Sequence, residues 1–357
     1  MSSPRRTSAR SPFTRSTVCR CTAAIAGGGL LLAGCAADTP PGSGDVDTVV
    51  AVTAFYPLHF LTEQVGAGVV EATDLTPPGA DPHDLELSPV DVAMIEQADV
   101  VVYLSGFQPA VDTAVEQVSG PMALDLAQVV DLEDTSATVR TTEGAAAHDD
   151  DAHNHDDAHD DDAHDHDDEG QAHHGDGEDD HAHDHGPLDP HFWLDAERMA
   201  RAAEAVADAL AEAAPGHADD LNANATALGT ALHDLDDRYR EDLASCTDEV
   251  MLVSHLAFGY LAQRYDLTQV GIAGLDPHVE PSPARLAEIR QVVQAEDVGT
   301  IFLDPLASPR VAEALADELD LQVRTLDSLE NRHHEDADYL DVMEMNLEAL
   351  TDGLVCA

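Results

Sequence analysis

The sequence contains no lysine: all sixteen basic residues are arginine, and they stand against 71 acidic residues, giving a formal net charge of −55. A chain this acidic repels nucleic acid and anionic lipid surfaces, and it raises the local concentration of cations. Aromatic residues are also scarce, at 4%, although 43% of the residues are hydrophobic and can supply ample core. We therefore expect a protein that binds no nucleic acid. Its acidity fits either cation binding or simple solubility.

The apolar run at residues 23–33 is too short to span a bilayer as a permanent helix. An arginine-rich start precedes this run and the sequence LAGC, ending at Cys35, closes it, which is typical of an export signal over residues 1–35. LAGC resembles a bacterial lipobox, in which the cysteine is lipidated and becomes the mature N-terminus. We therefore expect an extracytoplasmic protein anchored to the cell membrane by lipid on Cys35.

The five cysteines divide into two groups. Cys19 and Cys21 leave with the signal and Cys35 carries the lipid, so Cys246 and Cys356 remain. In an exported protein this pair is expected to form a disulfide that ties the C-terminus to the second half of the chain. Two buried free thiols are the alternative.

The chain length of 357 residues exceeds what a single hydrophobic core usually covers, which predicts two lobes. After a flexible tether at residues 36–47, rich in proline, glycine, serine and aspartate, strand and helix patterns alternate in both halves. Such alternation predicts an α/β fold in which each lobe is a parallel sheet flanked by helices. The expected strands cover residues 48–53, 69–75, 100–104, 122–124, 249–253, 269–272, 300–303 and 322–326. The expected helices include residues 57–66, 88–97, 107–118, 195–214, 258–264, 282–295 and 338–354.

A long helix is expected between the lobes, over residues 217–245. On it, apolar side chains recur every three or four residues, which marks one side as buried. At ~1.5 Å per residue this helix is about 40 Å long, enough to pass both lobes as a stiff connector. The N-terminal lobe is assigned residues 48–143 and 187–216, and the C-terminal lobe residues 246–357.

Residues 144–186 have a different composition. Between His148 and His185 there are 11 histidines and 17 acidic residues, with no basic residue. Such a segment cannot fill a core and is expected to be disordered without metal. It either gathers metal ions at low affinity or is a solvated charge run; we favour the first. The histidines are His148, His153, His155, His159, His164, His166, His173, His174, His181, His183 and His185.

Four residues at expected strand-to-helix junctions are candidate metal ligands. They are His83, His191, His255 and Asp327. A histidine at any one such place is more often a cap or a packed side chain than a ligand. Three imidazoles and a carboxylate together make a tetrahedral site, which suits zinc. Two further histidine-bearing segments, at His278 and at residues 333–336, are interpreted as surface residues.

Several ordered motifs resemble those of the zinc-binding solute receptors of ABC importers, the ZnuA and AdcA type. The resemblance covers about residues 48–355 and includes an acidic, histidine-rich insertion in the matching place. Several such motifs over a whole chain are specific, whereas a single one is not. The motifs are Phe55-Tyr56-Pro57-Leu58, Pro82-His83-Asp84-Leu85-Glu86-Leu87-Ser88-Pro89, Asp189-Pro190-His191-Phe192-Trp193-Leu194-Asp195, Ser254-His255-Leu256-Ala257-Phe258-Gly259-Tyr260 and Glu280-Pro281-Ser282-Pro283.

The resemblance implies a monomeric receptor that binds Zn²⁺ in a cleft between two lobes and delivers it to an ABC permease. By matching positions, the three histidines are zinc ligands, and Asp327 stands where relatives have a carboxylate or leave the position to water. Manganese receptors of the wider family tend to have a carboxylate in place of His255, so imidazole there favours zinc.

Other functions remain open. They are a manganese receptor of the same family, a surface lipoprotein for zinc storage or adhesion, and a zinc hydrolase. A hydrolase would need a metal-bound water and a nearby general base. Four protein ligands leave no coordination position for that water, so we expect no enzymatic activity.

Overall fold

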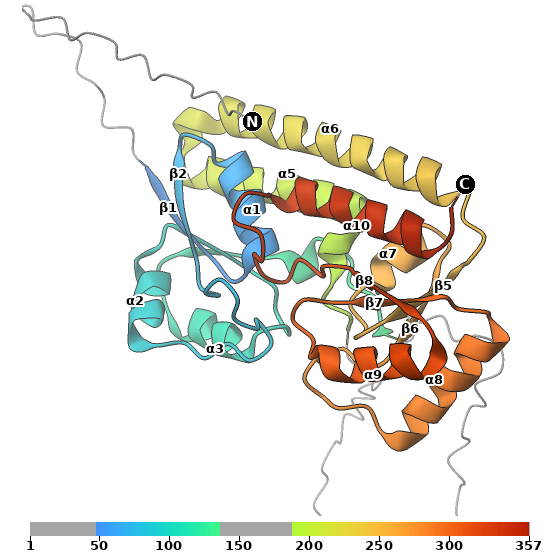
Figure 1. Ribbon diagram of the computed structural model, residues 1–357. Coiled ribbons are helices and arrows are strands. Elements are labelled where there is room, and N and C mark those ends of the chain that lie inside the picture. The colour runs from blue at the N-terminus through green and yellow to red at the C-terminus, as the bar shows by residue number, and fades with distance from the viewer. Residues whose placement is uncertain (1–47, 136–187, 357) are drawn as a thin grey trace, which may run out of the picture. The chain divides into compact units, whose positions relative to one another are not determined.

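The computed structural model describes residues 48–135 and 188–356, in which each half of the chain forms a four-stranded parallel sheet (Figure 1). The expected signal, tether and histidine-rich loop lie outside the described residues. The strand order is β2-β1-β3-β4 in the first lobe and β6-β5-β7-β8 in the second, so the two lobes repeat one topology. The strands are β1 (Val49–Thr53), β2 (Val70–Asp74), β3 (Val100–Tyr103), β4 (Met122–Asp125), β5 (Val250–Val253), β6 (Thr268–Gly271), β7 (Thr300–Leu303) and β8 (Gln322–Thr325).

Short polar signals begin the helices that flank the sheets. Ser88 and Asp91 form a capping box at α2, and the Ser282 hydroxyl accepts the Arg285 N–H at α8. Proline occupies the first turn of both, where its missing N–H has no helical partner to lose. The helices of the lobes are α1 (Tyr56–Val65), α2 (Pro89–Gln97), α3 (Pro109–Gln117), α7 (Gly259–Arg264), α8 (Pro283–Ala295), α9 (Pro309–Leu319) and α10 (Tyr339–Gly353).

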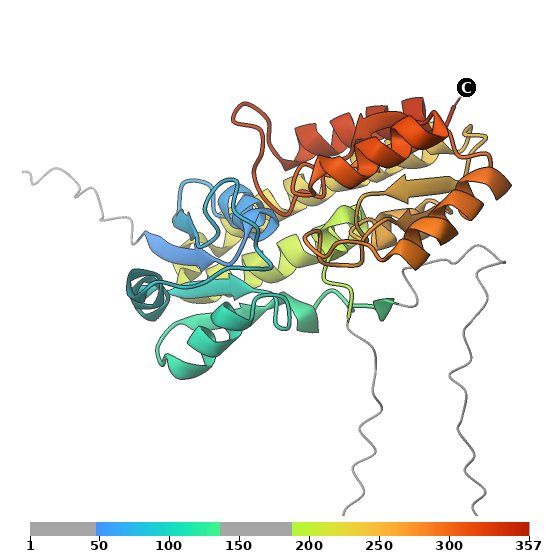
Figure 2. The same cartoon turned by 60° about the horizontal axis from the view of Figure 1, so that its bottom comes forward.

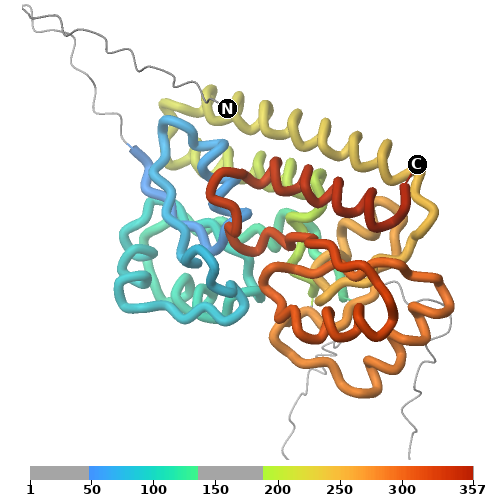
Figure 3. Tube along the Cα trace, viewed as in Figure 1, coloured from blue at the N-terminus to red at the C-terminus, as the bar shows by residue number. Residues whose placement is uncertain are grey.

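The helix α6 (Ala218–Leu243) lies beside α5 (Ala196–Ala213) and extends along both lobes, as the ribbon and the tube show (Figures 1 and 3). Hydrogen bonds attach α6 to a helix of each lobe. Asn224 donates to the Val65 carbonyl of α1 at 3.0 Å, and the Tyr239 hydroxyl donates to the Met343 carbonyl of α10 at 2.6 Å. The apolar stripe of α6 is buried as expected: Leu221, Ala225, Leu228, Leu232, Leu235, Tyr239 and Leu243.

The hydrophobic core is shared unequally between the lobes. One continuous cluster joins the first sheet, α5, α6, α10 and the inner part of the second lobe. A smaller cluster lies between strands β5, β6 and β7 and helices α8 and α9, and it includes Ile289 and Ile301. Figure 2 shows the blue-to-green first lobe on one side and the gold-to-red second lobe on the other. Within the described residues, no helix combines the length and apolarity that a membrane span requires.

The two-lobe α/β fold and the connector helix expected from the sequence are confirmed, as is the disulfide. Cys246, three residues after α6, is bonded to Cys356, three residues after α10. The bond therefore closes a loop containing the whole second lobe, with a sequence separation of 110 residues. Constraining so long a loop lowers the entropy of the unfolded chain.

We expect Cys246→Ser to lower the free energy of unfolding by about 2–5 kcal/mol, measured by guanidinium denaturation of the metal-free protein. Cys356→Ser and the double variant should give the same loss, because each removes the same single bond. Additive losses from the two single variants would mean that the thiols stabilise the fold through packing instead.

Asp74, at the end of β2, gives the fold a pH dependence. Burial raises its pKa to about 7, with the Thr76 N–H opposing the shift and Glu63 adding to it. Because the folded-state pKa exceeds the unfolded value of 3.8, stability falls as pH rises between these values, and the loss is complete above about pH 7.

We expect Asp74→Asn to be more stable than the parent by about 1–3 kcal/mol at pH 8 and equal to it near pH 4. The asparagine carbonyl can still accept the Thr76 N–H. Urea unfolding with a chelator present measures both values, and a stability gain that does not change with pH would contradict the assignment.

Candidate metal centre

Three imidazoles from distant parts of the chain meet at one carboxylate, that of Glu330. The Nε2 atom of His83 lies 3.0 Å from Glu330 Oε2. The Nε2 atoms of His191 and His255 lie 3.2 and 3.1 Å from Oε1. His191, His255 and Glu330 are fully buried, and the His83 side chain is 16% exposed. His83 and His191 come from the first lobe, and His255 and Glu330 come from the second. The site therefore lies between the lobes.

The parallel sheets bring these residues together. His83 lies in the connection after β2, His255 follows β5, and Glu330 lies in the segment after β8. In parallel sheets, loops at the carboxyl ends of strands form the binding crevice. His191 is placed differently, because it precedes the short 3₁₀ helix η2 (Phe192–Leu194) and follows no strand of either sheet.

The orientation of His191 is set by Asp189. One carboxylate oxygen of Asp189 accepts both the His191 backbone N–H, at 3.0 Å, and the ring Nδ1, at 2.8 Å. The Tyr260 hydroxyl of α7 donates to the Asp189 carbonyl at 2.8 Å and so ties this turn to the second lobe. With Nδ1 bound to a carboxylate, Nε2 is left to face Glu330, which is the usual arrangement around a metal-binding histidine.

The protonation states of the group are coupled. Burial of His191 disfavours its charged form, but the hydrogen bonds to Asp189 and Glu330 outweigh burial and raise its pKa to about 10. Burial likewise favours a neutral Glu330, yet the three imidazoles hold its pKa well below the usual range. The Glu330 carboxylate is therefore ionised, and in the metal-free site the protonated His191 ring lies between it and the carboxylate of Asp189.

Several buried atoms of this group lack a well-directed hydrogen bond. Among the described residues these atoms include Nε2 of His83 and His191, Nδ1 of His255 and Oε2 of Glu330. Buried polar atoms rarely stay unsatisfied, so such a cluster calls for a ligand. The potential ligand atoms of His83, His191 and Glu330 all lie within 4.8 Å of one another, as a single ion requires.

The structure does not bring Asp327 into this group. Its Oδ1 accepts the Leu329 N–H at 2.8 Å, which makes a tight turn, and its Oδ2 faces His333 Nδ1 at 3.2 Å. Asn346 of α10 binds both the backbone N–H and the carbonyl of Asp327, at 2.8 and 2.7 Å. Asp327 therefore shapes the segment after β8, and this segment presents Glu330, three residues later.

Sequence reasoning overlooked Glu330 because two carboxylates stand three residues apart and only the turn decides which one faces the histidines. Leu329 adopts a left-handed conformation, with φ of 58°, which its residue type does not predict. The available signal was that Asp is a typical turn-forming residue, whereas Glu is not. By that argument, Asp327 is the better turn residue and Glu330 the better ligand.

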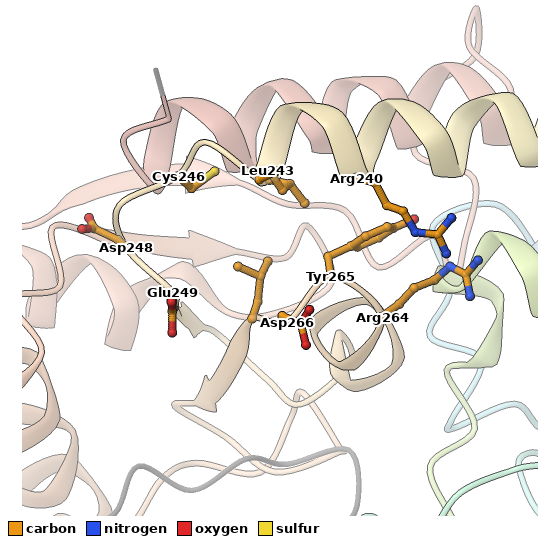
Figure 4. A pocket seen from close by; sticks show the side chains of 10 residues that line it. Arg240, Leu243, Cys246, Asp248, Glu249, Arg264, Tyr265 and Asp266 are labelled. Atoms are coloured by element: carbon orange, nitrogen blue, oxygen red, sulfur yellow. The ribbon is translucent and has the colours of Figure 1, made fainter.

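A separate pocket of about 380 Å³ lies at the end of α6, beside the disulfide (Figure 4). Arg240 and Arg264 stand at one end of it. Both arginines are already paired with the buried carboxylate of Asp236, so the pocket offers no free cation. The interlobe group of three histidines and Glu330 is the better candidate for a functional site.

The chain is similar to several named proteins that take up or bind metal. The chain is 30% identical to the high-affinity zinc uptake system protein ZnuA of Bacillus subtilis, over 91% of this chain and 94% of that protein. It is 32% identical to the zinc-binding lipoprotein AdcA of Streptococcus pneumoniae over 84% of its length, and spans about half of that longer protein, 54%. The solved laminin-binding protein Lmb of Streptococcus agalactiae, described as an adhesin with metal-transporting activity, is 26% identical with a TM-score of 0.68. That similarity covers 86% of this chain and 99% of Lmb.

A family model also matches nearly the whole described part of the chain. It is the model of ZnuA, the periplasmic component A of the zinc-uptake complex, and it matches residues 51–353. This range includes both sheets except the first two residues of β1, the connector helix α6 and all four residues of the interlobe group. The chain belongs to the ZnuA family of zinc-uptake receptors.

Proposed function

We propose that this protein is an extracytoplasmic receptor that captures Zn²⁺ between its lobes and delivers it to an ABC permease for zinc uptake. The main support for this proposal is that three imidazoles and one ionised carboxylate, from both lobes, meet in a buried site. The names of the relatives point the same way, since ZnuA and AdcA are zinc-uptake and zinc-binding proteins.

The proposed ligands are the Nε2 atoms of His83, His191 and His255 with the carboxylate of Glu330. Two ligand atoms bound to one tetrahedral zinc at ~2.0–2.1 Å lie about 3.3 Å apart. The Nε2 atoms of His191 and His255 lie 3.2 and 3.1 Å from one oxygen of Glu330, Oε1, and that of His83 lies 3.0 Å from the other, Oε2; each distance is close to that separation. Glu330 takes the role that the sequence suggested for Asp327.

The ligand set indicates capture rather than catalysis. Four protein ligands complete a tetrahedron and leave no position for an activated water. Neutral imidazoles also favour zinc over manganese, which prefers oxygen ligands. A hydrolase would need an open coordination position, and a manganese receptor would be expected to have more carboxylates in this group.

Delivery requires the receptor to stay near the membrane and to release its ion. The lipobox-like sequence ending at Cys35 supports a lipid anchor, and the histidines of residues 144–186 support an accessory role in gathering zinc. The four ligands come from two lobes, so separating the lobes removes ligands from the ion. Docking to the permease would supply that separation.

We expect residues 36–357 to bind one zinc tightly, and Glu330→Gln to weaken this binding at least about tenfold, because it removes the only charge among the ligands. Asp327→Asn is the matched control and should change the affinity by less than about threefold, since asparagine can keep the turn. Elemental analysis and competition with a chelator give the stoichiometry and affinity, and excess manganese should not displace the zinc.

A larger effect from Asp327→Asn than from Glu330→Gln would overturn the choice of carboxylate. Deleting residues 144–186 should remove weaker, additional zinc and leave the tight ion in place. Loss of the tight ion with that deletion would favour the storage function over the receptor.

Trp193, the only tryptophan, offers a measurement of zinc binding. Its Nε1 donates to the Ser328 carbonyl of the second lobe at 2.7 Å, and its ring lies 5.2 Å from the His191 ring. The indole is fully buried, so we expect zinc to change the intensity of its fluorescence through the neighbouring His191 ring and to leave its wavelength nearly unchanged. The intensity change should vanish in His191→Ala, and identical intensities with and without zinc in the parent would argue against binding beside His191.

A further inference from the structure

The connection that carries His83 is held by the opposite lobe at its backbone as well as at its imidazole. Asn331 follows the proposed ligand Glu330 and is 2% exposed. Its Oδ1 accepts the Gly79 N–H at 2.8 Å, and its Nδ2 donates to the Pro77 carbonyl at 3.0 Å and to the Ala80 carbonyl. One side chain of the second lobe thus satisfies three backbone groups of the first.

Only an amide of this length can make all three bonds, because it offers an acceptor and two donor hydrogens in one plane. A carboxylate would place an acceptor against two carbonyl oxygens, and an alkyl group would leave all three backbone groups without partners. Gly79 has a φ of 79°, a conformation that glycine adopts without strain, and this turns its N–H toward the second lobe.

A second contact reinforces the first nearer to the ligand. Asp81 Oδ2 lies 2.8 Å from His278 Nε2 of the second lobe, while Asp81 Oδ1 accepts the His83 N–H at 2.7 Å. The His278 side chain is about half exposed, so this pair contributes less than the buried amide. Both contacts act on residues 77–83, the segment that presents His83.

The same segment is held to its own lobe by a different side chain. Gln108 Nε2 donates to Thr76 Oγ1 at 3.1 Å and to the Pro82 carbonyl at 3.2 Å. These bonds lie within the first lobe and do not require the lobes to be together. The bonds of Asn331 do, because they join groups on opposite lobes.

We propose that Asn331 is a positioning residue for zinc retention: it clasps residues 77–83 across the cleft and thereby sets the rate at which bound zinc is released. The proposal rests on the function proposed above. Zinc association depends on the four ligands, so its rate does not depend on the three hydrogen bonds between Asn331 and residues 77–80, which we call the clasp. Release requires the lobes to part, and the three hydrogen bonds of Asn331 must then break together.

The test is the zinc dissociation rate of the full mature chain, measured by stopped flow against excess chelator. Asn331→Ala should release zinc at least about tenfold faster, with an association rate within about twofold of the parent. His278→Ala should have a smaller effect, about threefold or less, because its ion pair is exposed.

Asn331→Asp separates hydrogen bonding from charge. It keeps an acceptor for Gly79 but loses both donors, so the clasp predicts faster release than in the parent. The added negative charge beside the ion predicts slower release if electrostatics dominates. Slower or unchanged release in this variant would overturn the proposal.

Gln97→Ala is the control for losing a side-chain-to-backbone bond elsewhere, since Gln97 Nε2 donates to the Ala93 carbonyl at 2.8 Å within α2. It should leave both zinc rates unchanged. If Asn331→Ala lowered the thermal stability of the metal-free protein and slowed association as well, Asn331 would be a general structural residue and the proposal would fail. Failure of the parent to bind zinc would instead refute the proposed function.

Discussion

The structure depends on one buried carboxylate shared by three imidazoles. Glu330 lies with its oxygens 3.0–3.2 Å from three Nε2 atoms, and no arginine takes part in these contacts. Without a cation, such a group keeps unsatisfied buried nitrogens and oxygens between the lobes. A divalent ion satisfies the Nε2 atoms of His83 and His191 and the Glu330 carboxylate together, which links the energy of zinc binding directly to lobe closure.

The connector helix α6 restricts the movement of the lobes that accompanies zinc binding and release. Since α6 is bonded to α1 in the first lobe and to α10 in the second, it limits how the lobes can separate. The apolar cluster that continues from the first sheet into the inner part of the second lobe has the same effect. Opening is therefore expected to be small, and it should concentrate at the loops that carry the ligands.

The sequence predicted the fold well because its signals were local. Ser88, Asp195 and Ser282 cap helices that begin close to the predicted starts, and the apolar stripe on α6 is buried over its full length. The candidate site was only partly predictable. The three histidines do converge, but the choice between Asp327 and Glu330 depended on a left-handed residue, Leu329, whose conformation no local pattern indicates.

The interlobe hydrogen bonds of Asn331 could not be predicted from the sequence for a related reason. Their partners are backbone groups about 250 residues earlier in the chain, and every residue type other than proline has the same backbone groups. The consequence is a division of labour between two neighbouring residues. In the proposed receptor, Glu330 is the ligand that contributes charge, whereas Asn331 binds residues 77–80 through neutral hydrogen bonds that carry no preference among metals. Selectivity and retention can therefore be tuned separately, which suits a receptor that must bind zinc tightly and still release it to a partner.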